Sequence, residues 1–195
     1  MTRIAIIIGS TRPGRRGRAV AEWVAAVSAQ EQPTVDFEIV DLADFELPLL
    51  DEEQPALFGR YGHAHTRRWA EAIAGYDGFV FVTPEYNHSI PGALKNALDF
   101  IYAEWNNKAA GFVGYGLHGG ARAVEHLRLI LAELKVATVR TQVGLSLHDD
   151  FTLTVPTEPG AFTPGAHQHR ALSGLLDDVV VWSRALQPVR EGVPA

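Results

Sequence analysis

The sequence predicts an α/β protein in which a parallel sheet is covered by helices on both faces. Short, uninterrupted apolar runs alternate along the chain with longer segments whose apolar residues recur every three or four positions. Uninterrupted runs are typical of strands buried on both faces, and the longer spacing is typical of amphipathic helices. Because five segments of each kind alternate, the strands are predicted to be parallel and to lie between two helical layers.

In the first half of the chain, residues 4–8 are predicted as a β-branched strand that ends at a glycine. Apolar residues then recur at helical spacing up to about residue 29, which predicts the first helix. The second strand is predicted at 35–42 and the second helix at 65–75. Residues 43–62 between them form a long, acidic connection that contains prolines.

The second half continues the alternation. Strands are predicted at 79–82, 110–115 and 136–143, and helices at 92–102, 120–134 and 171–186. We expect a single domain over residues 1–187 and a flexible tail over 188–195, since chain ends are the usual place for loose segments.

The composition narrows the function classes. The chain of 195 residues is 47% apolar and 21% charged, which suits one globular domain. It contains no cysteine, so disulfides, thiolate metal sites and cysteine nucleophiles are excluded, and a reducing cytoplasm is the expected location. The net charge of −6 argues against nucleic acid as a partner. No apolar run is long enough to span a bilayer, so no membrane partner is expected.

The loop after the first strand, residues 9–17, is rich in glycine and arginine. Glycines let a chain wrap closely around an anion, arginines grip phosphate, and a helix N-terminus carries partial positive charge. The loop therefore suits a terminal phosphate. It has neither the Walker A spacing nor the Gly-x-Gly-x-x-Gly spacing. The same pattern is also typical of a basic surface turn, and the residues alone favour neither interpretation.

Two further loops follow the third and fourth strands. Residues 83–92 hold an aromatic residue between two prolines, which suits a stiff platform for a planar ring or, equally, an ordinary rigid connection. Residues 114–122 contain four glycines, which indicate either close approach of the backbone to a ligand or a tight turn. In a parallel sheet, the loops at the carboxyl ends of the strands carry the ligand site.

Several histidine and serine patterns do not predict a functional site. Histidine pairs at 63 and 65 and at 167 and 169, and the His-Asp-Asp run at 148–150, lack the spacing of a ligand set, so no metal site is predicted. Ser89 and Ser173 lack the Gly-x-Ser-x-Gly elbow, so hydrolase chemistry is not expected. Trp105 follows the predicted helix at 92–102 and could reach the ligand edge.

The three loops together carry a resemblance to a known family. The segments are residues 8–12 (Ile-Gly-Ser-Thr-Arg), residues 82–87 with 91–99, and residues 114–116 with 119–122. They closely resemble the NADPH-dependent FMN reductase family over about residues 3–143, and the middle segment is the most specific. The resemblance implies a flavodoxin-like three-layer sandwich, a five-stranded parallel sheet of order 2-1-3-4-5 and tightly bound FMN.

The resemblance also implies the cofactor site. According to the resemblance, the FMN phosphate would be surrounded by Ser10, Arg12, Arg15, Arg16 and Gly17. Along the isoalloxazine ring it implies Pro84, Glu85, Tyr86 and Asn87, with Gly116 and Gly119 on the other side. Many relatives carry a hydroxyl or an amide where this chain has Arg15 and Gly17, so the grip on phosphate is expected to rely more on guanidinium and backbone groups.

The expected activity is transfer of hydride from NADPH or NADH through N5 of FMN to a small acceptor, by a ping-pong mechanism. Since the flavin carries the chemistry, no catalytic side chain is named. The family implies free flavin, quinones, azo compounds or chromate as acceptors. It also implies a homodimer or homotetramer formed through the helix from Gly92 to Tyr102, whose spacing alone is equally typical of an ordinary amphipathic helix.

Two other functions remain open at the level of sequence. A flavodoxin-type electron carrier would bind FMN without turning over NAD(P)H. An interaction or regulatory protein would keep the fold without the flavin. The platform at 84–87 and the helix that follows it favour the enzyme.

Overall fold

The computed structural model describes residues 1–152 and 160–192. Its centre is a five-stranded parallel sheet of order β2-β1-β3-β4-β5, as the resemblance implies. The strands are β1 (Arg3–Ile8), β2 (Asp36–Asp41), β3 (Gly78–Pro84), β4 (Ala109–Gly116) and β5 (Ala137–Ser146). The chain order reverses between β1 and β3, so a crevice is expected beyond the carboxyl ends of these two strands.

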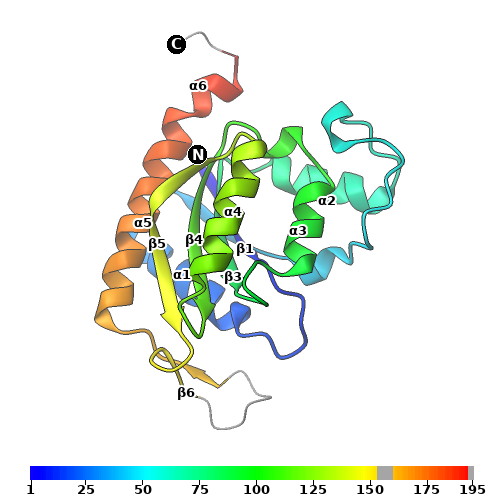
Figure 1. Ribbon diagram of the computed structural model, residues 1–195. Helices are drawn as coiled ribbons and strands as arrows, with labels where there is room; N and C mark the ends of the chain where they lie inside the picture. Colours follow the sequence, from blue (N-terminus) through cyan, green and yellow to red (C-terminus); the bar gives the residue numbers. More distant parts are fainter. Residues whose placement is uncertain (153–159, 193–195) are drawn as a thin grey trace.

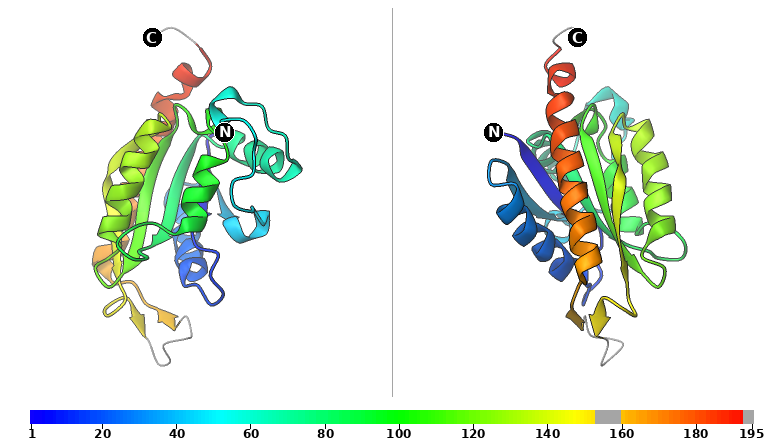
Figure 2. Two further views of the ribbon diagram at one scale, coloured as in Figure 1. Left: turned by 45° about the vertical axis from the view of Figure 1, so that its right-hand side comes forward. Right: turned by 90° about the vertical axis from the view of Figure 1, so that its left-hand side faces the viewer.

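Helices cover both faces of the sheet (Figure 1). They are α1 (Gly17–Glu31), α2 (Ala64–Ala74), α3 (Gly92–Asp99), α4 (Ala121–Glu133) and α5 (Ala166–Ala185). The right-hand view in Figure 2 shows α1 and α5 on the near face, with the other three helices behind the sheet. The result is the three-layer sandwich that the alternating pattern predicts.

Strand β1 explains why the layers form. Its side chains alternate between the two faces, and each face meets an apolar helix surface. Ala5 and Ile7 belong to the core under α2, α3 and α4, whereas Ile4, Ile6 and Ile8 belong to the core under α1 and α5. All five side chains are fully buried. The apolar run is continuous because neither face of the strand meets water.

The structure corrects several predicted boundaries. Helix α5 begins at Ala166 rather than 171, because its first turn is polar and exposed and therefore lacks apolar spacing. Helix α3 ends at Asp99 rather than at 102, because Phe100 and Ile101 turn into the core. A short antiparallel pair of strands, β6 (Phe151–Thr152) and β7 (Ala161–Phe162), was not predicted. Short 3-10 helices also interrupt the connections, at η1 (Leu42–Phe45), η2 (Ala56–Phe58) and η3 (Ala103–Trp105).

The predicted flexible tail differs from the structure at its start. Residues Gln187–Arg190 form helix α6, and the guanidinium of Arg190 donates to Asp77 over 2.6 Å. This ion pair ties the helix to the turn before β3. The end of the predicted tail, 193–195, lies outside the described residues.

Trp105 does not reach the ligand edge of the sheet. Its side chain is fully buried, and its ring lies against Trp69, Phe79 and Phe81. The suggestion that it contacts a ligand at the carboxyl ends of the strands is therefore wrong. Residue spacing placed it just after a helix but could not show that the chain turns inward there.

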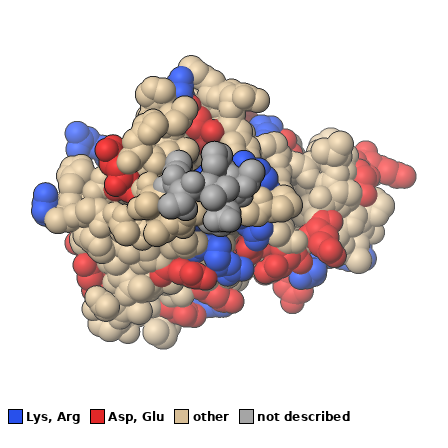
Figure 3. Space-filling model, turned by 90° about the horizontal axis from the view of Figure 1, so that it is seen from below, with Lys and Arg blue, Asp and Glu red and all other residues tan. Residues whose placement is uncertain are grey.

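The loops after β1, β3 and β4 gather at one edge of the molecule, at the lower end in Figure 1. Figure 3 looks onto this edge, and Lys and Arg atoms lie near its middle. Among the described residues, no helix is long and apolar enough to cross a membrane.

Candidate functional site

A cavity of about 120 Å³ opens where the loops after β1, β3, β4 and β5 meet. We name it the arginine cavity. The ends of β3 and β4 and the segments after β1, β3 and β5 supply its lining, which consists of Arg12, Arg16, Pro84, Glu85, Tyr86, Tyr115, Gly116 and Leu147. It lies at the carboxyl ends of the strands, where the sheet topology predicts a ligand.

The first and second loops are joined through Ser10. The Ser10 side chain is fully buried, and its Oγ lies 2.9 Å from the hydroxyl of Tyr86. The guanidinium of Arg12 lies over the Tyr86 ring, 6.0 Å from its centroid. The aromatic residue between the two prolines thus packs against the basic loop, 76 residues away in the sequence.

Helix α1 begins at this cavity without a side-chain cap. Its N-cap residue is Arg16, which makes no capping hydrogen bond through its side chain, and its first turn has no acidic residue. The backbone N–H groups at such an end favour an anion. The first helical residue is Gly17, where a Cβ would lie 3.0 Å from Ile8 and 3.1 Å from the Tyr115 hydroxyl. A glycine therefore lets the helix start close to β4.

Tyr115 was not predicted to belong to the site. It is 5% exposed, and burial raises the pKa of its hydroxyl, as does the nearby Tyr86. The phenol is therefore a neutral group at ordinary pH, and it lines the cavity, where its oxygen accepts the backbone N–H of Gly17. Its position in the sequence, at the end of an apolar strand, resembles that of any core aromatic.

The second loop contains a tight turn from Tyr86 to Ser89. The backbone N–H groups of these two residues donate to each other's carbonyl oxygens over 2.9 and 3.1 Å. The two central residues, Asn87 and His88, have φ angles of +48° and +75°. Two successive positive φ values are characteristic of a type I′ turn, in which asparagine is favoured. Asn87 thus shapes the platform and does not line the cavity.

Glu85 connects the platform to the start of α4. Its carboxylate forms an ion pair with the Arg122 side chain and accepts the Arg122 backbone N–H over 3.2 Å. Burial alone would raise the pKa of Glu85, but the hydrogen bond and charge of Arg122 outweigh it and hold the pKa below its ordinary value. The residue thus lines the cavity and anchors the N-terminus of α4.

The glycines of the third loop differ in position: one lines the cavity, and the others pack closely against the backbone of β4 or β5. Gly116 lines the cavity, and a Cβ there would lie 3.3 Å from the Glu85 side chain. Gly119, with φ +66°, packs against Gly144 of β5 and does not line the cavity. At Gly120, with φ +67°, a Cβ would lie 2.7 Å from the backbone nitrogen of Tyr115. The loop can fold back on the sheet only because these positions have no side chain.

Arg15 and Arg18 face a carboxylate instead of the cavity. The terminal nitrogens of Arg15 and Arg18 lie 2.6 and 3.1 Å from Oδ2 of Asp41, whose side chain is 1% exposed. The sequence prediction placed Arg15 beside Arg12 and Arg16 in one basic group. In the structure, the buried carboxylate divides this group into two.

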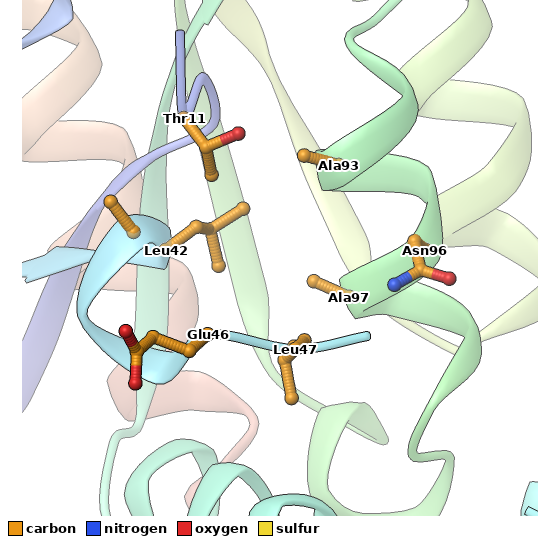
Figure 4. Close-up of a pocket in the computed structure, with 8 residues that line it drawn as sticks. Thr11, Leu42, Glu46, Leu47, Ala93, Asn96 and Ala97 are labelled. Atoms are coloured by element: carbon orange, nitrogen blue, oxygen red, sulfur yellow. The ribbon is translucent and has the colours of Figure 1, made fainter. Parts of the chain in front are cut away.

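A second cavity, of about 280 Å³, lies on the α3 side of the first loop (Figure 4). Leu42 and Leu47 approach it from the connection after β2, opposite Ala93 and Ala97 of α3. Its polar lining includes Glu46, which would repel a phosphate. The Asn96 amide is already bonded to the backbone of residues 48 and 50, over 2.6 and 2.9 Å. Its lining therefore does not suit an anion, whereas the arginine cavity does.

Six of the eleven predicted site residues line the arginine cavity: Arg12, Arg16, Pro84, Glu85, Tyr86 and Gly116. Ser10 reaches it through Tyr86. The other four lie outside the lining, namely Arg15, Gly17, Asn87 and Gly119. Sequence reasoning missed Tyr115 and Leu147. Leu147 follows β5 in a polar segment, and no local signal marks it.

Comparisons with known proteins identify the family. The sequence profile of the family described as NADPH-dependent FMN reductase matches residues 2–150. An NAD(P)H-dependent FMN reductase of Schizosaccharomyces pombe is 41% identical over 150 residues, which cover 76% of this chain and 74% of the relative. One from Nectria sp. is 35% identical and covers 98% of this chain and 96% of the relative. A quinone reductase of Escherichia coli is 33% identical over 138 residues, 68% of this chain and 70% of the relative.

The fold is also found among solved structures. The flavoenzyme NAD(P)H:(acceptor) oxidoreductase FerB from Paracoccus denitrificans superposes with a TM-score of 0.72 at 21% identity. The match covers 95% of this chain and 98% of that one. The likeness supports the flavodoxin-like architecture. Since the profile match covers more than half of the chain and the relatives exceed 30% identity, the chain belongs to the NADPH-dependent FMN reductase family.

Proposed function

We propose that this protein binds FMN in the arginine cavity and transfers reducing equivalents from NADPH or NADH to a small acceptor. The observation that carries the proposal is that Arg12 and Arg16, at the start of α1, line one cavity together with the platform at 84–86 and Gly116. A phosphate and a planar ring are the chemistry that these two halves suit.

The residues present fit FMN on two counts. The basic half combines two guanidinium groups with the positive end of the α1 dipole, which together suit a phosphomonoester. The other half offers prolyl and tyrosyl surface beside backbone N–H and C=O groups, which suit a ring with an apolar face and a polar edge. We propose that the six predicted residues in the lining contact the cofactor, with Arg12 and Arg16 holding the phosphate, and that the other five shape the loops around it.

When bound, FMN supplies the hydride-transfer chemistry at its N5, so no catalytic side chain is required. Arg12 and Arg16 would fix the position of the phosphate. Pro84, Glu85 and Tyr86 would orient the ring, and the third loop would present backbone donors toward its electron-rich edge. Because donor and acceptor would use the same exposed ring face in turn, we expect ping-pong kinetics.

Free flavin, quinones, azo compounds and chromate are the acceptors we propose. We also propose that two or four copies assemble through α3, in the cytoplasm, which supplies NAD(P)H. Residues 48 and 50 are hydrogen-bonded to Asn96 of α3. Leu49, which lies between them, is 85% exposed, and Leu57, later in the same connection, is 64% exposed. An apolar surface of this kind suits a contact between copies.

The test begins with the absorption spectrum of the purified protein, which should show a bound flavin. Oxidation of NADPH and of NADH is then measured with menadione, FMN and ferricyanide as acceptors. Steady turnover with parallel double-reciprocal plots supports the proposal. Negligible turnover by a flavin-loaded protein would identify an electron carrier, and a colourless protein that cannot be reconstituted with FMN would contradict cofactor binding.

A further inference from the structure

Asp41 lies beside the first loop but does not line the arginine cavity. It is the last residue of β2, and the sheet register pairs it with Ile8, two residues before Ser10. Its Oδ2 meets Arg15 and Arg18 over 2.6 and 3.1 Å. Its Oδ1 accepts the backbone N–H of Ala43 over 3.1 Å, and this bond caps the start of η1. Both carboxylate oxygens are thus engaged.

The contact with Arg15 is largely buried. The side chain of Arg15 is 20% exposed, and that of Asp41 is 1% exposed. The Nε of Arg15 is buried without a hydrogen-bond partner among the described residues, so the terminal nitrogen carries the contact with the carboxylate. Removing one member of a buried pair leaves the other charge without compensation. Neutralising Asp41 should therefore release the loop that carries Arg15.

The two tethered arginines flank the point where α1 begins. Arg16, between them, already has helical backbone angles of φ −81° and ψ −15°. Arg15 precedes the N-cap residue and Arg18 is the second residue of α1, yet both side chains reach the same carboxylate oxygen. With Arg15 and Arg18 held at Asp41, Arg16 is directed elsewhere, and it lines the arginine cavity.

We propose that Asp41 is a positioning residue for the FMN phosphate. By holding Arg15 and Arg18, it fixes the loop in the arrangement that brings Arg12 and Arg16 to the cavity. Phosphate recognition thus depends on a carboxylate that does not touch the ligand. The inference rests on the proposed binding of FMN in this cavity, and it changes the role of Arg15 from a phosphate ligand to a support.

The test compares FMN with riboflavin, which has the same ring and no phosphate. Asp41→Asn keeps the size of the side chain and an oxygen for the η1 N–H but removes the charge. Dissociation constants of both flavins are measured by quenching of flavin fluorescence. We expect the constant for FMN to rise about tenfold, equivalent to about 1.4 kcal/mol, and that for riboflavin to change less than about twofold.

Asp44→Asn is the matched control. It makes the same change of charge three residues away, at an exposed position in η1, and should leave both constants unchanged. Arg18→Gln serves as the second variant if Asp41→Asn does not fold, because the Arg18 side chain is 48% exposed and its loss is more easily tolerated. It should weaken FMN binding selectively, by about threefold, or about 0.7 kcal/mol.

Three outcomes overturn the proposal. Equal losses for both flavins would show general damage to the fold. An unchanged constant for FMN would show that the tether is irrelevant to phosphate. Tighter FMN binding would show that Asp41 competes with phosphate for Arg15. If the wild-type protein binds neither flavin, the proposed function fails, and that result differs from all three.

Discussion

The hydroxyl of Tyr86 lies 2.9 Å from Oγ of Ser10, and this contact joins the second loop of the site to the first. Because Ser10 is fully buried, its hydroxyl has little access to water as a substitute partner. We expect Tyr86→Phe and Ser10→Ala each to destabilise the fold, with a coupling free energy of about 0.5–1.5 kcal/mol in a double-mutant cycle. Urea unfolding of the four proteins measures it. Strict additivity would show that the two hydroxyls do not interact.

Arg12 is expected to bind the phosphate of FMN directly, since it lines the arginine cavity. Arg12→Ala should weaken FMN binding by about 1.5–3 kcal/mol, the range for a hydrogen bond to a charged group. Isothermal titration calorimetry gives the dissociation constant of FMN. The control is Arg140→Ala, at an exposed position of β5 outside the cavity lining, which should leave it unchanged. An unchanged titration for Arg12→Ala would remove this residue from the site.

Gly120 and Gly174 should respond in opposite ways to alanine. Gly120 has φ +67°, and a Cβ there would lie 2.7 Å from backbone, so Gly120→Ala should destabilise the protein by at least about 2 kcal/mol. Gly174 lies inside α5, where a Cβ would meet Thr141 at an ordinary 3.8 Å. Gly174→Ala should therefore stabilise the fold by about 0.5–1 kcal/mol. Thermal and urea unfolding compare the two, and equal effects would contradict the proposed backbone crowding.

Lys108 should make stability depend on pH. It is 5% exposed, and its Nζ donates to the carbonyls of Ile73 and Ala74 at the end of α2. Burial, with the nearby charge of Arg190, lowers its pKa from 10.5 to about 8. Between these values the unfolded chain holds the proton that the folded protein has released, so stability should rise with pH across this window, by up to about 3 kcal/mol.

Lys108→Met removes this titration, so the variant should lack the rise. Urea unfolding at several values between pH 7.5 and 9.5 measures the difference between the two proteins. The range stops below pH 10 because the pKa of Tyr76 is raised to about 12 by burial and by a hydrogen bond to Glu38. An unfolded tyrosine ionises first, which lowers stability above pH 10. A rise of equal size in both proteins would assign it to another group.

The sequence by itself determined the layers and marked the loops that meet at the candidate site. Continuous apolar strands and helices with period 3.6 are local patterns, and they identified the three-layer architecture. The glycine, proline and arginine composition marked the loops after β1, β3 and β4, and the resemblance supplied the strand order. These features could be predicted because backbone periodicity and turn chemistry depend on residues close together in the chain.

Only the tertiary structure decided which side chains line the arginine cavity. Arg15 and Arg16 are neighbours with the same charge, yet the former is held at Asp41 and the latter lines the cavity. Tyr115 and Trp105 are both aromatic residues near loops, yet one borders the site and the other is enclosed in the core. The direction of a side chain depends on partners supplied by distant strands, such as Asp41 from β2, and no local pattern records them.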